Sequence, residues 1–358
     1  MAFPAFDSKN ALHYVLAVGL VFAVSYVGTL YKQAMDSGAG DEYDLIRKYL
    51  LNESPLYGYN KPKLWIHTKY EYNARRWASF GSRSSTDLNQ PYIHLCIKSV
   101  VGRCADDFNV VLIDDDAFSK LVPAWDLDDV SALPEPDRAR ARAIGLASLL
   151  YLYGGMVVPN TFVCQRSLLP LYERGTDRNK LFVCENVSRL CASASAARAP
   201  EFAPDSFFMG ARKDNAAARG WLDLLKARVA ARGQICDVDA RAQEARWFAR
   251  QIREEQVELV DGALVGVKDA ARRPVPLEAL FEEAYLRLHP DAFGLYIPGD
   301  AVLARRQYGW FATMGEADLL AQDAYACKAL AAAIVDATGG EYAREHKSGR
   351  AKTGVLSI

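Results

Sequence analysis

The chain has 358 residues, a formal net charge of -1 at pH 7 and 51% hydrophobic residues. This length is enough for one large domain or two small ones with a substantial core. The balanced charge argues against a nucleic-acid-binding protein. The seven cysteines contain no Cys-x-x-Cys pair, which argues against a zinc ribbon or a dense disulfide scaffold and leaves one or two disulfides open.

An apolar run occupies residues 11–31. Between Lys9 and Lys32, the only side chain that titrates near neutral pH is that of His13. The run is long enough to cross about 30 Å of hydrocarbon at about 1.5 Å per residue. A cleaved signal peptide is the alternative, but its apolar core is normally shorter, at about 7 to 15 residues. We therefore predict a single-pass N-terminal membrane anchor at residues 1–32, in the Golgi or ER or in a virion membrane.

The orientation of this anchor stays open, because the lysines and arginines on its two sides give only a weak bias. Residues 33–61 are polar and are expected to form a stem. A folded domain is expected over residues 62–340, and the basic, polar stretch 341–358 is expected to be disordered. Asn52 and Asn186 each lie in a glycosylation sequon, which matters only if the domain is lumenal.

Apolar strands alternate with helical patterns through the first two thirds of the domain. Strands are expected at 63–68, 109–114, 156–158, 181–184 and 206–210, and helices at 88–101, 118–125, 142–153, 214–232, 240–256, 277–287 and 317–337. This order predicts an α/β fold with a mostly parallel sheet flanked by helices and a helical C-terminal part.

The stretch 142–164 is the most informative part of the chain. An apolar helix is expected to end at Gly154-Gly155, because glycine enters the left-handed C-cap conformation without steric cost. A short strand follows and brings Pro159-Asn160-Thr161 to its end, at the edge of the sheet where ligands bind in open α/β folds. We expect Leu150, Tyr153 and Val157 to be buried and one of the two glycines to have a positive φ.

This helix, Tyr-Gly-Gly and strand resemble the signature of GT-A-fold glycosyltransferases of the capsular-polysaccharide-synthesis and DXD sugar-binding type. The resemblance implies a Rossmann-like GT-A fold over residues 62–230. In those families an Asp-x-Asp at the strand end holds a divalent metal on the sugar-nucleotide diphosphate, and an Asp and an Arg of the helix help to hold the donor. Here the triplet is Pro159-Asn160-Thr161, and Ala143 and Leu146 replace the helix residues.

The resemblance and the strand ends together suggest donor-binding residues. His67 ends the first strand, where the families place a histidine, and the loop after it offers arginine and serine side chains for an anion. The candidates are His67, Arg76, Ser82, Arg83, Asp114, Asp116, Asn160 and Thr161. Each has an ordinary structural alternative: a helix cap for the aspartates, a turn for the triplet and a solvated loop for the arginines.

A catalytic base is harder to assign, and Asp205 and Glu185 are candidates only because they lie at later strand ends. Magnesium and manganese prefer anionic oxygen ligands, whereas an amide and a hydroxyl supply no charge. The sequence therefore predicts no divalent-metal site and no other cofactor.

Two functions follow. The first is a membrane-anchored glycosyltransferase-like protein that transfers or binds a sugar from a nucleotide-sugar donor without a metal. The second is a catalytically inactive scaffold with the same fold that binds a partner at a membrane, with a viral origin as one option. The expected partners are a nucleotide sugar and a membrane contacted through residues 11–31, and the glycan acceptor is left open.

Overall fold

The computed structural model describes residues 61–68, 90–188, 202–230 and 237–337, except positions 124, 128, 136 and 284. The chain divides into two compact units, residues 1–51 and 52–358, and all described residues belong to the second. The expected anchor (1–32), nearly all of the stem and the tail (341–358) thus lie outside the described residues. Within the described ranges, no helix combines the length and the apolar character that crossing a membrane requires.

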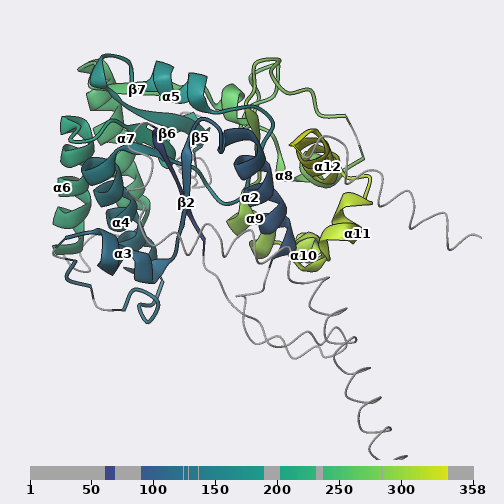
Figure 1. Cartoon of the computed structure of the whole chain (residues 1–358), viewed down its shortest axis with the longest axis horizontal. Coiled ribbons are helices and arrows are strands. Elements are labelled where there is room, and N and C mark those ends of the chain that lie inside the picture. Colours follow the sequence, from purple (N-terminus) through teal and green to yellow (C-terminus); the bar gives the residue numbers. More distant parts are fainter. Residues whose placement is uncertain are drawn as a thin grey trace, which may run out of the picture. The chain divides into compact units, whose positions relative to one another are not determined.

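A six-stranded sheet lies at the centre of this unit, in the order β2-β1-β3-β6-β5-β7 (Figure 1). Its strands are β1 (Lys63–His67), β2 (Asn109–Ile113), β3 (Gly155–Val157), β5 (Leu181–Val187), β6 (Phe202–Ala211) and β7 (Val257–Val260). Strand β1 pairs in parallel with β2 and β3, and β5 with β7, whereas β6 is antiparallel to both neighbours. Five of the six strands therefore run in one direction, which confirms the mostly parallel sheet.

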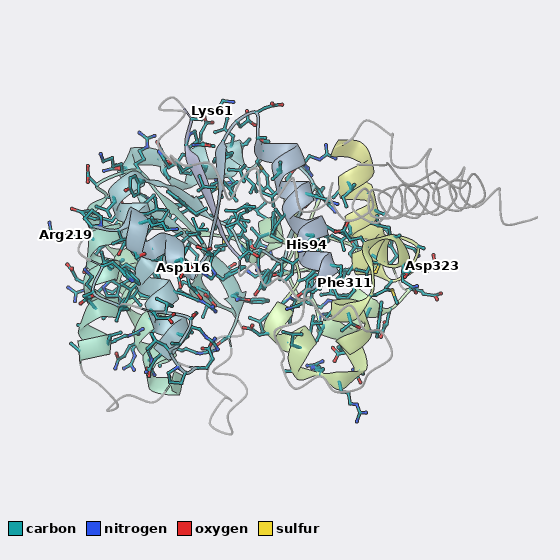
Figure 2. The ribbon with its side chains drawn as sticks, turned by 60° about the horizontal axis from the view of Figure 1, so that its bottom comes forward. Lys61, His94, Asp116, Arg219, Phe311 and Asp323 are labelled. Carbon is teal, nitrogen blue, oxygen red and sulfur yellow. The ribbon has the colours of Figure 1, made fainter. Side chains whose placement is uncertain are left out.

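One group of helices packs on the sheet and builds a core with it. It comprises α3 (Asp115–Leu121), α4 (Asp137–Tyr153), α6 (Ala216–Ala230) and α7 (Asp237–Arg253), which lie to the left of the sheet in Figure 1. Buried Trp65, Met209 and Trp221 belong to this core. In Figure 2, Asp116 of α3 and Arg219 of α6 both lie in the left half of the view.

A second core lies around α2 (Pro91–Cys104), with Tyr92, Leu295 and Phe311 at its centre. Its other members are the two-stranded antiparallel sheet of β4 (Phe162–Cys164) and β8 (Gly294–Tyr296) and the helices α8 (Leu277–Phe281), α9 (Gly299–Ala304), α10 (Gly309–Thr313), α11 (Glu316–Leu320) and α12 (Tyr325–Ala337). This region confirms the helical C-terminal part. A short helix, α5 (Leu169–Gly175), and 3-10 turns at 177–179, 262–265 and 306–308 complete the elements.

The sequence prediction was wrong at two C-terminal helices. The helix expected over 277–287 ends at Phe281, because the following segment makes backbone contacts elsewhere: Tyr325 N donates to Glu282 O, and Leu288 forms a bridge with Asp269. The helix expected over 317–337 is interrupted between α11 and α12. Strands β4, β7 and β8 were not predicted.

The turn between α4 and β3 confirms most of its predictions. Gly154 and Gly155 have φ values of 69° and 103°, and Leu150 and Val157 are buried. A Cβ on Gly155 would lie 2.1 Å from the carbonyl oxygen of Lys63, so this position needs glycine for space as well as for conformation. Tyr153 corrects the prediction, since it is only partly buried; its hydroxyl donates to Leu121 O at 2.8 Å.

Candidate functional site at the carboxyl edge of the sheet

The carboxyl ends of the five parallel strands meet at one edge of the sheet, which is where ligands bind in open α/β folds. The antiparallel strand β6 contributes its beginning to the same edge. The polar residues that these strands place there are His67, Asp114, Asp115, Asn160, Thr161, Glu185, Asp205 and Asp261. Six of the eight are candidates from the sequence, and Asp115 and Asp261 are additions.

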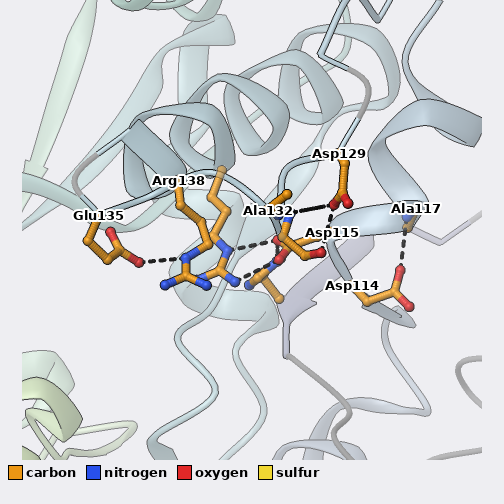
Figure 3. Close-up of polar contacts among 10 residues, drawn as sticks. Asp114, Asp115, Ala117, Asp129, Ala132, Glu135 and Arg138 are labelled. Carbon is orange, nitrogen blue, oxygen red and sulfur yellow. Dashed lines mark hydrogen bonds and ion pairs between the residues drawn. The ribbon is translucent and has the colours of Figure 1, made fainter. Parts of the chain in front are cut away.

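Asp115 forms the centre of an ion cluster between β1, α3 and α4. Arg142 donates two hydrogen bonds to its carboxylate, from Nε to Oδ1 at 2.7 Å and from Nη2 to Oδ2 at 2.6 Å. His67 Nε2 lies 2.9 Å from Oδ1. Since an ionised carboxylate only accepts, Nε2 carries the hydrogen of this contact. Figure 3 shows Asp115 in this network and Asp114 beside it, directed toward Ala117.

The spacing of residues on α3 and α4 places this cluster. Asp115 and Phe118 are three residues apart on α3, as are Arg142 and Gly145 on α4, so each pair shares a helix face. A Cβ on Gly145 would lie 2.4 Å from the Phe118 ring, so the glycine lets that ring pack directly against α4.

The Phe118 ring in turn stacks on the ring of His67, with centroids 5.6 Å apart and planes inclined by 2°. Trp125 also stacks on Phe118, with ring centroids 5.4 Å apart and planes inclined by 27°. The three rings form an aromatic ladder that fixes the orientation of His67 toward Asp115.

The carboxylate of this cluster is more buried than the arginine and the histidine that contact it. The side chain of Asp115 is 6% exposed, whereas those of His67 and Arg142 are 15% and 24% exposed. Burial raises the pKa of Asp115, but the hydrogen bonds from Arg142 and His67 and their charges outweigh it, so the pKa lies below its usual value. The Arg142 guanidinium is therefore more accessible to a ligand at this end of the edge than the Asp115 carboxylate.

Asp114 and Asp116, the candidates on either side, have different roles. Asp114 caps α3 by accepting a hydrogen bond from Ala117 N at 2.9 Å, which is the structural alternative weighed for it. Asp116 is exposed. Sequence reasoning missed the buried middle residue, Asp115, although its spacing of three residues from the apolar Phe118 marks the inward face of α3.

A second ion cluster lies at the far end of the edge, and its arrangement is reversed. Lys268 Nζ contacts Glu185 Oε2 and lies 3.2 Å from Asp261 Oδ1. It also lies 4.4 Å from the centre of the Phe202 ring. The lysine is 8% exposed, whereas Glu185 and Asp261 are 20% and 32% exposed. Here the buried charge is the cation, and the two carboxylates are more exposed; Arg272, which is 77% exposed, also lies 3.6 Å from Asp261 Oδ2.

Asp205, the other candidate base, lies next to Cys184 in the β5–β6 pairing and is held by two hydrogen bonds. It accepts from Phe207 N at 2.9 Å and from Asn186 Nδ2 at 3.1 Å. Glu185 likewise accepts from Gly262 N at 3.0 Å. The amide of Asn186 is buried in this contact, so its sequon is a poor acceptor for a glycan.

Asn160 and Thr161 lie after β3, between the two clusters. Thr161 is buried, its carbonyl accepts from Ile297 N at 3.2 Å, and the turn is closed by Phe162 N donating to Pro159 O at 3.1 Å. These neutral oxygens do not fit a divalent cation, which prefers carboxylates. In the described ranges, no group of three or more His, Cys, Asp and Glu side chains is placed to hold a metal ion.

Three donor-binding candidates from the sequence, Arg76, Ser82 and Arg83, lie outside the described residues. A hollow of about 350 Å³, lined by Arg174, Arg178, Lys180 and Glu258 among others, lies at the opposite, amino edge of β5 and β7. The carboxyl edge is thus distinct from this hollow.

The chain is an α/β protein with polar side chains at the carboxyl edge of its sheet. Comparisons with known proteins say little about what binds there. No protein-family model matches the chain, and no curated protein does so. Two solved structures that resemble it are both glycosyltransferases. One is the apo form of GlyE from Streptococcus pneumoniae, with 11% identity over 57% of this chain and a TM-score of 0.32. The other is the PaToxG glycosyltransferase, with 13% identity over 54% of this chain and a TM-score of 0.31.

The chain spans 46% of the length of GlyE and 70% of that of PaToxG. Likenesses this distant say nothing about substrate or activity. The proposal below therefore rests on the residues of this chain.

Proposed function

We propose that this chain is a glycosyltransferase-like protein that binds a nucleotide-sugar donor at the carboxyl edge of its sheet without a divalent metal. The observation that carries the proposal is the reversed burial of the two ion clusters along one edge. A nucleotide sugar also has two different parts, because its diphosphate is anionic and its sugar carries neutral hydroxyl groups.

The diphosphate belongs at the end formed by β1 and β2. Arg142 and His67 are more exposed there than Asp115, and a guanidinium pairs well with phosphate oxygens. Arg76 and Arg83, which follow β1 in the sequence, are proposed to add positive charge in place of a metal. Trp125, at the end of the aromatic ladder, offers a flat surface on which a base can stack.

The sugar belongs toward β3 and the end formed by β5 and β7. Asn160 is partly exposed and supplies an amide, which suits sugar hydroxyl groups, whereas Thr161 is buried beside it. The outward carboxylates of Glu185 and Asp261 accept hydrogen bonds from hydroxyl groups and repel a phosphate. This arrangement gives the donor one orientation along the edge.

A second candidate function is a binding protein that holds such a ligand without transferring the sugar. It is favoured by the contacts of the two candidate bases. Glu185 is engaged by Lys268 and Gly262 N, and Asp205 by Phe207 N and Asn186, so both carboxylates already have structural hydrogen bonds. A general base must instead accept a proton from the acceptor hydroxyl.

Calorimetric titration of uridine and guanosine diphosphate sugars into the full-length chain tests the proposal, with chelator or with manganese present. We expect at least one of these nucleotide sugars to bind with the same dissociation constant in chelator and in manganese. Arg142→Gln is expected to weaken binding at least tenfold, whereas Arg138→Gln, one turn earlier on α4 and paired with Glu135, is the control of equal charge change. Binding that requires manganese, or no binding at all, contradicts the proposal.

Release of nucleoside diphosphate separates the two candidates. If bound donor is turned over with an added glycan or with water, the chain is a transferase. If it is recovered intact, the chain is a binding protein.

We also propose that residues 11–31 anchor the chain in a membrane. The support is the uncharged apolar run followed by a polar stem. Without residues 1–32, the chain should be extracted without detergent. Circular dichroism should show that the remaining residues stay folded. Aggregation of the shortened chain, together with detergent-free extraction of the full-length one, contradicts the anchor.

A further inference from the structure

Two cysteines from distant parts of the sequence meet between α2 and β4. Cys104 is the last residue of α2, and Cys164 is the last residue of β4. Their sulfur atoms are 3.8 Å apart, and both residues are fully buried. They lie outside the edge described above and play no part in the proposed donor binding.

The backbone holds the two sulfur atoms in this position. Cys164 N donates to Ser99 Oγ at 2.9 Å, and Ser99 Oγ donates to Cys96 O at 2.6 Å, which ties the end of β4 to the middle of α2. The Cys164 sulfur is also 3.1 Å from Arg166 O. The thiols face each other because the strand is attached to the helix that carries Cys104.

We propose that Cys104 and Cys164 are a modification site that forms a disulfide when the chain meets a small-molecule disulfide such as oxidised glutathione. A disulfide needs a sulfur–sulfur distance of about 2.05 Å, so each sulfur has to move by about 0.9 Å. In the balanced reaction, the two cysteine thiols give up two protons and two electrons, and the small disulfide takes them up as two thiols.

The thiolate of one cysteine attacks the small disulfide, releases one small thiol and gives a mixed disulfide. The other cysteine then attacks this mixed disulfide, forms the Cys104–Cys164 bond and releases the second small thiol. Because both sulfur atoms are buried, the oxidant reaches them while the chain folds or when β4 separates from α2.

The bond would close a loop that contains part of the proposed donor site. Asp115, Arg142, Asn160 and Thr161 all lie between the two cysteines. A cross-link over such a long loop restricts the unfolded chain and so raises stability, without any new contact at the sheet edge.

The test uses the purified full-length chain, kept for hours in oxidised glutathione or in dithiothreitol. Free thiols are then blocked with N-ethylmaleimide in denaturant, and the digest is analysed by mass spectrometry. We expect the 104–164 cross-linked peptide in the oxidised sample, a loss of two hydrogen atoms per chain, and a melting temperature several degrees above that of the reduced chain.

Cys104→Ala is expected to abolish this difference between oxidised and reduced chains. The matched control is Cys96→Ala, which removes another fully buried thiol of α2 and should leave the difference unchanged. Peptide mapping of the unmodified chain tests the proposal even if a variant does not fold. N-ethylmaleimide or glutathione on both cysteines, or a cross-link to a different cysteine, overturns the proposal.

Discussion

Asp115 and Lys268 are both buried charges at the carboxyl edge of the sheet, and each is neutralised by partners nearer to solvent. At Asp115 the more exposed partners are an arginine and a histidine. At Lys268 they are two carboxylates, Glu185 and Asp261. Which charge is buried therefore decides what the surface of the edge presents to a ligand.

The two clusters also differ in how firmly the buried charge is held. Arg142 binds the Asp115 carboxylate through two parallel hydrogen bonds, and the aromatic ladder orients His67. Lys268 is a point charge with no such geometry, and its carboxylate partners are more exposed. The first cluster is therefore expected to contribute more to stability than the second.

The largest expected effect is that of Asp115→Ala. It leaves the Arg142 guanidinium partly buried without its carboxylate, which we expect to cost about 3 kcal/mol of unfolding free energy. Denaturant unfolding followed by tryptophan fluorescence measures this. The control is Asp116→Ala, which removes an exposed carboxylate next in sequence and should change stability by about 0.5 kcal/mol or less. If the two variants lower the unfolding free energy equally, Asp115 does not make the contacts with Arg142 and His67 described above.

Acid should remove the same stabilisation. The pKa of Asp115 is lowered in the folded chain, so its contribution is fully present above its unfolded pKa of about 3.9 and is lost as pH falls toward the folded value. We expect the stability difference between the unmodified chain and Asp115→Asn to shrink as pH falls from 5 to 3. A difference that stays constant over this range contradicts the assigned direction of the pKa shift.

These two predictions concern residues that the sequence only partly revealed. The alternation of strands and helices was enough for the fold class, and Gly154-Gly155 was enough for the turn after α4, because these signals are local. Strand β4 has only three residues and exists through its pairing with β8, which lies more than a hundred residues later. Nothing in three residues specifies such a partner.

The site was harder to predict for the same reason. His67 was found because a strand ends there, but its partner Asp115 was hidden between Asp114 and Asp116, which fit the Asp-x-Asp pattern. The contact between Arg142 and Asp115 spans 27 residues, and that between Lys268 and Glu185 spans 83. A sequence supplies these charges but does not indicate which of them are buried together.

The next effect in size is that of Lys268→Met, which removes the buried charge of the second cluster and keeps its apolar stem. Glu185 retains Gly262 N and has access to water, so we expect a cost of about 2 kcal/mol, less than that of Asp115→Ala. Lys180→Met is the control on the same pair of strands, because Lys180 pairs with the more exposed Glu258 at 3.0 Å. An ion pair this exposed contributes about 0.5 kcal/mol to the unfolding free energy. A larger cost for Lys180→Met would reverse the ranking of these sites.

The smallest expected effect tests the polarity of the edge directly. Inorganic pyrophosphate, the simplest analogue of the donor diphosphate, should bind at the cationic cluster and raise the unfolding free energy by about 1.4 kcal/mol at ten times its dissociation constant. Arg142→Gln should abolish this increase, because it removes the outward guanidinium. Lys268→Met should preserve it, because it leaves Arg142 in place and removes a positive charge from a cluster that still holds Glu185 and Asp261. Thermal unfolding of the three chains with and without pyrophosphate measures the differences, and each chain is compared with itself so that loss of stability by mutation cancels. If the pyrophosphate effect disappears in Lys268→Met and survives in Arg142→Gln, the orientation proposed for the donor along the edge is reversed.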